Sequence, residues 1–232
     1  MIEVRPFASL GGADHGWLKA RHHFAFAEYF DPARVHWGGL RVWNDDEIAP
    51  NTGFPPHPHA DMEIITYVRD GAITHQDSLG NKGRTVAGDV QVMSAGSGVR
   101  HAEYNFEPDT TRIFQIWILP REKGGCPAWG TKPFPKADRS GAFVALASGF
   151  AEDSEALPIR ADARVLGATL RKGETATYRL GADRHGYLVA AAGTVEVNGT
   201  RLAARDGAAI KDVETLSVTA LTDCELVLVD AR

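Results

Sequence analysis

Two short stretches of the sequence carry side chains that could bind a metal ion, His57-Pro58-His59 and His101-Ala102-Glu103. In each stretch, one residue separates the two metal-capable side chains. Alternate residues of a β-strand point to the same face, so each stretch would present a pair of ligands on one side of a sheet. Two such pairs brought together surround a point with three imidazoles and one carboxylate. That donor set suits a divalent first-row transition metal with coordination positions left open.

The segments around these stretches have the pattern of β-strands. Apolar residues alternate with others in residues 62–68, and similar short runs recur at 90–93 and 113–119. Gly, Asn and Asp separate the runs. Short strands at regular spacing with such turns are typical of a β-sandwich or barrel. The sequence therefore predicts an all-β fold, in which only residues 14–29 and 152–157 leave room for a turn or two of helix.

The second half of the chain repeats the strand pattern of the first. A stretch rich in proline and glycine, residues 120–135, is interpreted as a linker or long connection between the two halves. Residues 67–74 match the pattern of residues 188–195, and residues 85–92 match that of residues 202–209. These two matches, in the same order, indicate an internal duplication of one β domain.

The composition excludes several classes of protein. The chain has 232 residues, a net charge of −5 and scattered Lys and Arg, so it has no basic surface for nucleic acid. No segment approaches the roughly 18 apolar residues of a membrane span. Cys126 and Cys224 lie far apart, which favours reduced thiols, and the N-terminus lacks the apolar core of a signal peptide. We expect a protein of the cytoplasm that binds neither nucleic acid nor membrane.

The two metal-capable stretches lie in sequence surroundings that resemble the paired motifs of the cupin superfamily, a small β-barrel with an internal metal. The finer resemblance is to the pirin family, and in overall length to its shorter bacterial members of the quercetinase type. It is strong over residues 1–120 and weak beyond. The motifs that carry it are His57-Pro-His59, Asp61-Met-Glu-Ile64, the run Met93-Ser-Ala-Gly-Ser-Gly-Val-Arg-His-Ala-Glu-Tyr-Asn105, Asp45-Asp46, His75-Gln-Asp77 with its Gly80-Asn81 turn, and Gln115-Ile-Trp-Ile118.

The resemblance implies a bicupin with two jelly-roll-like barrels in tandem. We expect an N-terminal metal-binding cupin domain at residues 1–130 and a C-terminal cupin domain without metal ligands at residues 131–232, because His185 is the only histidine of the second copy. Since a two-domain chain can bury its strand edges internally, we expect a monomer. The sequence leaves the role of the C-terminal domain open.

The resemblance also implies that His57, His59, His101 and Glu103 are the metal ligands, in agreement with the spacing. In cupins generally, the glutamate after the first histidine pair binds the metal, which would be Glu63 here. Residues 57, 59, 61 and 63 share a face if their strand is regular, so Glu63 remains the alternative to Glu103.

Other polar and aromatic residues have weaker claims to a role. His22 and His23 are adjacent, would face opposite sides of a strand, and are interpreted as structural. His75 and Asp61 could orient a ligand from outside the metal site. The N-terminal segment is dense in aromatic residues, which could form core or the wall of a pocket for a flat ligand: Phe24, Phe26, Tyr29, Phe30, Trp37 and Trp43.

The pirin resemblance implies a dioxygenase that opens the central ring of a flavonol such as quercetin with O2 and releases carbon monoxide. The expected cofactor is one divalent ion, first Fe(II), with Mn, Co, Ni, Cu or Zn also compatible with the ligands. Glu103 would be the general base for the substrate hydroxyl. The alternative is a non-catalytic regulatory protein that responds to metal or redox state and acts through a protein partner.

Overall fold

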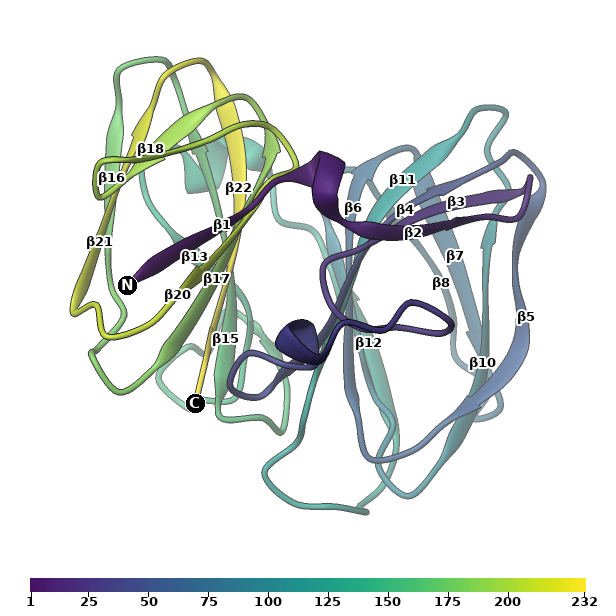
Figure 1. Ribbon diagram of the computed structural model, residues 1–232. Helices are drawn as coiled ribbons and strands as arrows, with labels where there is room; N and C mark the ends of the chain where they lie inside the picture. The colour runs from purple at the N-terminus through teal and green to yellow at the C-terminus, as the bar shows by residue number, and fades with distance from the viewer.

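β-strands form nearly all of the regular structure, which is described for residues 1–232 by a computed structural model. Figure 1 shows two β units side by side, each built from one seven-stranded and one four-stranded sheet. The predicted all-β fold is therefore confirmed. The turns of helix for which residues 14–29 and 152–157 left room do not form, because both segments contain strands and turns instead. The helical segments are short 3₁₀ helices: η1 (Phe7–Ser9), η2 (Pro32–Arg34) and η3 (Lys136–Arg139).

The N-terminal unit contains the strands that carry the two metal-capable stretches. Its large sheet has the order β12-β9-β6-β11-β4-β3-β2 and its small sheet the order β5-β10-β7-β8. All neighbouring strands in it are antiparallel. The strands are β2 (Gly11–Asp14), β3 (Leu18–His22), β4 (Leu40–Ile48), β5 (Thr52–His59), β6 (Glu63–Asp70), β7 (Ala72–Asp77), β8 (Lys82–Val86), β9 (Val90–Ser94), β10 (Val99–Asn105), β11 (Thr111–Ile118) and β12 (Ala128–Lys132).

The C-terminal unit repeats this design. Its large sheet has the order β1-β20-β17-β22-β15-β13-β14 and its small sheet the order β16-β21-β18-β19. The strands are β1 (Ile2–Arg5), β13 (Val144–Ser148), β14 (Leu157–Pro158), β15 (Ala163–Leu170), β16 (Thr175–Arg179), β17 (His185–Ala192), β18 (Val195–Val197), β19 (Thr200–Leu202), β20 (Gly207–Ile210), β21 (Thr215–Ala220) and β22 (Cys224–Ala231).

The strand orders follow the predicted internal duplication. The run β6 to β9 occupies the same places in the N-terminal sheets as β17 to β20 in the C-terminal sheets. These are the strands that contain the matched sequence segments. The small sheets correspond in the same way, so that β5 and β10 of the first unit are the counterparts of β16 and β21 of the second.

Two edge strands depart from the division of the chain predicted from the sequence. β1, at the very N-terminus, pairs with β20, so residues 2–5 belong to the C-terminal sheet (Figure 1). The stretch interpreted as a linker, residues 120–135, contains β12, which pairs with β9 of the N-terminal sheet. That interpretation was therefore wrong for residues 128–132. The domain boundary near residue 130 falls inside this strand and stays a prediction.

The two units pack through the outer faces of their large sheets. A single cluster of 24 buried hydrophobic residues joins them, with Tyr67 and Phe114 from one side and Tyr187 and Val229 from the other. Because side chains alternate along a strand, the neighbours of these residues, Thr66 among them, point the other way, into the N-terminal barrel. The four central strands of the large sheet, β9, β6, β11 and β4, thus contact the interface with one face and the barrel interior with the other.

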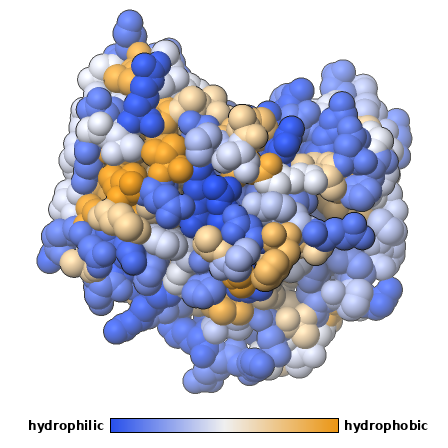
Figure 2. Space-filling view, in the orientation of Figure 1, coloured by the Kyte–Doolittle hydropathy of each residue, from blue (hydrophilic) through white to orange (hydrophobic).

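The exterior is mostly hydrophilic, and in the face drawn in Figure 2 hydrophobic residues lie to the left of and below a hydrophilic group at the centre. No helix is long and apolar enough to cross a membrane. Cys126 is exposed and Cys224 is buried, and neither forms a disulfide.

Candidate metal centre

The histidine pair His57 and His59 lies on β5, an edge strand of the small sheet. Three prolines occur in this strand, at positions 55, 56 and 58. Proline cannot donate a hydrogen bond to a neighbouring strand, so it is tolerated at a sheet edge and excluded from the centre. β5 pairs with β10 so that His57 stands directly opposite His101. A register shift between His101 and Glu103 then sets Glu103 opposite Phe54.

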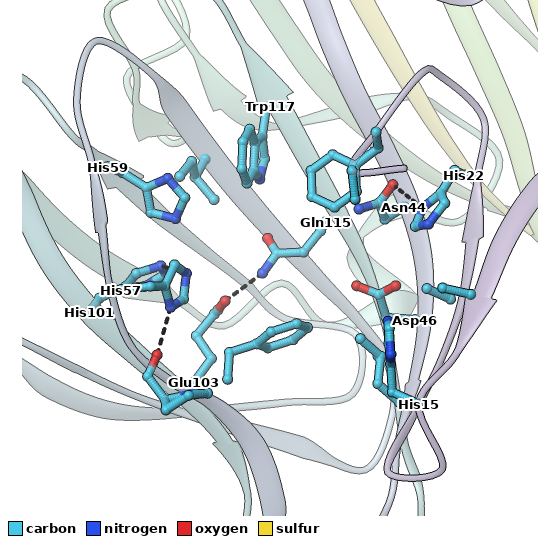
Figure 3. A pocket seen from close by; sticks show the side chains of 18 of the residues that line it. His15, His22, Asn44, Asp46, His57, His59, His101, Glu103, Gln115 and Trp117 are labelled. Atoms are coloured by element: carbon cyan, nitrogen blue, oxygen red, sulfur yellow. Dashed lines mark hydrogen bonds between the residues drawn. The ribbon is translucent and has the colours of Figure 1, made fainter. Parts of the chain in front are cut away.

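The structure brings the three histidines of the predicted ligand set together. Potential ligand atoms of His57, His59 and His101 all lie within 4.8 Å of one another. The Nε2 atoms of His57 and His101 are 3.1 Å apart, and the ring of His59 packs edge-on against Trp117 with centroids 4.9 Å apart. A second group within the same distance limit contains His101, Glu103 and His75. Glu103 therefore adjoins the histidine cluster, which it shares through His101 (Figure 3).

Hydrogen bonds outside the cluster indicate which nitrogen of His57 and of His101 carries the proton. The Nδ1–H of His57 donates to the carbonyl oxygen of Pro55 at 2.7 Å, which leaves Nε2 with a free lone pair. The Nε2–H of His75 donates to the Asp77 carboxylate at 3.2 Å. The Nδ1 atoms of His75 and His101 lie 3.4 Å apart, and where His75 accepts the Nδ1–H of His101, His101 also keeps a free lone pair on Nε2.

The two facing Nε2 atoms are thus both acceptors. Two lone pairs 3.1 Å apart repel unless a cation lies beside them. A divalent metal ion is such a cation, and neutral imidazole is the form of histidine that binds it. The geometry of the site therefore fits a metal ion, and this conclusion is independent of any sequence resemblance.

Burial keeps the imidazoles of His59 and His101 neutral. Desolvation lowers the pKa of His59 to about 3, and repulsion from His101 and His57 adds to the effect. Desolvation likewise lowers the pKa of His101 to about 3, with contributions from His57 and His75 that outweigh the opposing charge of Asp77. The free lone pairs needed for metal binding are therefore available at neutral pH.

Glu103 is held by a set of hydrogen-bond donors from the large sheet. Gln91 Nε2 donates to Oε1 at 2.6 Å, Gln115 Nε2 donates to Oε2 at 2.5 Å and Thr66 donates to Oε1 at 3.2 Å. Burial raises the pKa of Glu103 above its ordinary value, while His75 and the hydrogen bonds from Thr66 and Gln115 oppose that rise. The carboxylate is therefore fixed in orientation, and its pKa lies above that of an exposed glutamate.

Glu63 lies away from this centre. The chain turns at Asp61, whose φ is 53°, so residues 57 to 63 do not form one regular strand. Glu63 begins β6 in the large sheet, and its Oε2 accepts from Ser94 Oγ at 2.6 Å and from the backbone N–H of Arg160 at 3.1 Å. Its carboxylate therefore connects the two halves of the chain. A regular strand over residues 57–63, as the spacing suggested, would not have placed Glu63 there.

Among the other histidines, the structure separates the adjacent pair as expected. His22 points into the N-terminal barrel, where its Nδ1 bonds Asn44 Oδ1 at 2.9 Å, and His23 points to the interface, where its Nδ1 bonds Tyr187 at 2.9 Å. Neither joins the cluster. Asp61 accepts from the backbone N–H of Gly124 at 2.6 Å and orients no imidazole.

His75 lies directly behind His101, with its ring stacked on Trp129 at 4.9 Å. Gln91 and Thr66 could not be recognised from the sequence, because their contact with Glu103 depends on strands that meet only in the fold. Gln115 belonged to the family motif, but its contact with Glu103 could not be inferred from it.

A cavity of about 520 Å³ opens onto the cluster. Its volume is typical of a small-molecule site, and its walls are largely apolar. Of the aromatic residues of the N-terminal segment, Phe26 lines it, whereas Phe24, Trp37 and Trp43 lie in or against the interface core and Phe30 is exposed. The aromatic lining is Trp17, Phe26, Phe54 and Trp117, and the polar lining includes His57, His59, His101, Glu103, Gln115, Asn44, Asp46, His22 and His15.

Comparisons with known proteins agree with this architecture. The family model for pirin matches residues 3–118, and that for the quercetinase C-terminal cupin domain matches residues 145–231. A pirin-like protein of Caulobacter vibrioides is 77% identical over 100% of both chains. A protein of Escherichia coli K12 named quercetin 2,3-dioxygenase is 40% identical over 99% of this chain and 98% of its own.

A solved structure of the bacterial pirin YhhW from Escherichia coli in complex with nickel(II) superposes with a TM-score of 0.93 at 39% identity, covering 100% of this chain and 99% of its own. These similarities extend over both barrels and confirm the resemblance and the tandem cupin fold. The chain belongs to the pirin family of cupin proteins.

Proposed function

We propose that this protein is a metal-dependent dioxygenase that cleaves a flavonol such as quercetin. One molecule of O2 would be consumed, the central ring would open to a phenolic ester, and one carbon would leave as carbon monoxide. His57, His59, His101 and Glu103 would hold the ion, with Fe(II) as the expected metal. Relatives named as quercetin 2,3-dioxygenases support the reaction class.

The observation that carries the proposal is the placement of the four donors on one apolar cavity. Three imidazoles and a carboxylate meet at one part of its wall, and Trp17, Phe54 and Trp117 supply flat aromatic surface elsewhere. Flat polyphenols match such a cavity, because stacking and apolar contact bind the rings while the polar groups at the cluster bind an oxygen. A divalent ion held there would supply Lewis-acid and redox chemistry.

Glu103 is the residue best placed to remove the proton of the substrate hydroxyl. Its carboxylate is buried, adjoins the cluster and is oriented by Gln91 and Gln115. A base is effective when it lies within hydrogen-bond reach of the proton and burial has raised its pKa. The proton would pass from the flavonol 3-hydroxyl to a carboxylate oxygen, so that the substrate binds as an anion beside the imidazoles.

The test is oxygen consumption on adding quercetin to protein reconstituted anaerobically with Fe(II), and in parallel with Mn, Co, Ni, Cu and Zn. We expect rapid uptake of O2 with an equal amount of carbon monoxide. We also expect Glu103→Gln to lose turnover by a factor of about 100 or more, the range that general bases contribute. No uptake with any metal, in protein shown to hold the ion, would contradict the proposal. It would favour the non-catalytic regulator that acts through a protein partner.

A further inference from the structure

The wall of the cavity away from the histidine cluster carries a second group of polar side chains. Asn44 and Asp46 occupy alternate positions of β4 and therefore point to the same face, into the barrel. Both line the cavity, and they are 5% and 2% exposed. In Figure 3 the Asp46 carboxylate faces the interior on the opposite side from His57 and His59, with Glu103 and Gln115 between them.

Asp46 has a buried carboxylate oxygen without a partner. Its Oδ1 atom is fully buried and makes no hydrogen bond, and its Oδ2 atom, which is not fully buried, has no hydrogen-bond partner in the protein either. An unpaired buried polar atom costs free energy, so a folded protein retains one mainly where function requires it. The adjacent Asp45 shows the contrast, because its carboxylate is bound by Arg69 on one oxygen and by Arg205 at 2.6 Å on the other. Of these two aspartates, only the one that faces the cavity lacks cationic partners.

Asn44 adds a hydrogen-bond donor beside this carboxyl. Its Oδ1 is occupied by the Nδ1–H of His22 at 2.9 Å, which turns the amide Nδ2 toward the cavity. Asn44 is also paired across the sheet with Gln115, whose own amide donates to Glu103. Asn44 and Gln115 are thus neighbours on one sheet, but the amide of Gln115 is bonded to Glu103, whereas the amide of Asn44 faces another part of the cavity.

We propose that Asp46 and Asn44 form a subsite that hydrogen-bonds a phenolic hydroxyl group of the substrate, on the part of the molecule remote from the oxygen at the histidine cluster. The assignment rests on the proposed flavonol reaction and specifies its substrate class as a polyhydroxylated aromatic. A phenol both donates and accepts, so it can bond Oδ2 of Asp46 and the free amide of Asn44 at once. The apolar walls between would hold the rings.

The electrostatic surroundings of Asp46 support an uncharged ligand here. Burial raises the pKa of Asp46 well above its ordinary value, and the neighbouring carboxylates of Asp45 and Glu103 raise it further against the opposing charge of Arg69. Burial and the two neighbouring carboxylates therefore disfavour an anionic ligand beside Asp46 and favour a neutral hydroxyl group.

The test compares two probes, quercetin and 3-hydroxyflavone, which share the 3-hydroxyl but differ in all other hydroxyls. Dissociation constants are measured by fluorescence titration under argon on full-length protein loaded with nickel(II). We expect the wild-type protein to bind quercetin about ten times more tightly than 3-hydroxyflavone, the effect of one net hydrogen bond of about 1.4 kcal/mol. In Asp46→Leu this ratio should fall to about one. Asp46→Ala provides the same test if the leucine does not fit.

The matched control is Phe26→Leu, on the apolar wall, which should weaken both probes together and preserve their ratio. A ratio that persists in Asp46→Leu and Asp46→Ala would overturn the subsite while leaving the flavonol reaction intact. Failure of the wild-type protein to bind either probe would overturn the proposed function and the substrate class with it. Melting more than about 5 °C below wild type in both metal-free Asp46→Leu and metal-free Asp46→Ala would also overturn the assignment. Such a shift in both variants would show a structural role, whereas removing an unpaired buried carboxyl should not destabilise the protein.

Discussion

The two barrels of this chain have the same strand order, but the side chains that fill their interiors differ in chemistry. In the N-terminal barrel, β5 and β10 place His57 opposite His101. The corresponding strands of the C-terminal barrel, β16 and β21, place Ala176 opposite Val218, and both are buried. One pair of strands therefore supplies the histidines of the candidate metal centre, and its counterpart supplies hydrophobic core.

The difference extends to the packing of each barrel. The C-terminal barrel is filled by one cluster of 18 buried hydrophobic residues, whereas the N-terminal barrel holds separate clusters of six and four around its cavity. Burial of apolar surface is the main source of folding free energy. The C-terminal barrel and the shared interface thus supply the packing that the N-terminal barrel lacks around its site, which gives the C-terminal half a physical role.

Removing one imidazole of the predicted ligand set should have the largest effect on the difference in metal binding between the two barrels. We expect His101→Ala to lose nearly all bound metal after reconstitution with Ni(II), because the variant removes a donor from the centre of the cluster. The matched control is His185→Ala, which alters the only histidine of the second half and should keep its metal. Metal content is measured by mass spectrometry of the desalted protein. Equal loss of metal in both variants would contradict the placement of the metal centre in the N-terminal barrel alone.

The residues behind His101 should come next. Asp77→Asn and His75→Gln disturb the hydrogen bonds that fix the protonated nitrogen of His101, and such changes lower metal affinity by about 10- to 100-fold. Competition with a chelator of known affinity measures the change. Gln76→Ala is the control, because this residue of the same strand is exposed. Wild-type affinity in both Asp77→Asn and His75→Gln would exclude this role.

Acid should destabilise the metal-free protein through histidines buried in the N-terminal half. Burial and nearby arginines lower the pKa of His23 to about 3 from an ordinary 6.5. Below pH 6.5 the unfolded chain therefore binds a proton that the folded chain does not. His23 contributes a loss of unfolding free energy of about 1.4 kcal/mol per pH unit as the pH falls toward 3.

Urea unfolding at several pH values should show this slope reduced by that amount in His23→Phe. His36→Gln, at an exposed position, should retain the wild-type slope. A slope in His23→Phe equal to that of wild type would mean that His23 is not the residue responsible.

The smallest effect is expected at Glu63. Glu63→Gln weakens hydrogen bonds to Ser94 and Arg160 by removing the charge of their acceptor, at a cost of about 1 kcal/mol in unfolding free energy. It should retain metal, whereas Glu103→Ala should lose it. Loss of metal in Glu63→Gln together with retention in Glu103→Ala would reverse the assignment of the carboxylate.

Features set by local spacing could be predicted from the sequence. The i and i+2 placement of His57 and His59 follows from the period of a strand, and the turns that separate the strands are local as well. These features suffice to predict the β fold and to nominate the side chains of the centre.

Features set by distant pairing could not be predicted. β1 pairs with a strand about 200 residues later, and nothing in residues 2–5 specifies that partner. β12 lies in a segment rich in proline and glycine, where local preference argues against a strand and the free edge of β9 overrides it. The separation of Glu63 from the histidine cluster likewise depends on one left-handed residue, Asp61.

The most direct test of the central claim is anomalous X-ray diffraction at the nickel edge from crystals of the Ni(II)-loaded protein. The structure predicts one peak in the N-terminal barrel, about 2 Å from nitrogen atoms of His57, His59 and His101 and from a carboxylate oxygen of Glu103, and none in the C-terminal barrel. A peak bound by other residues, or a second peak inside the C-terminal barrel, would contradict it.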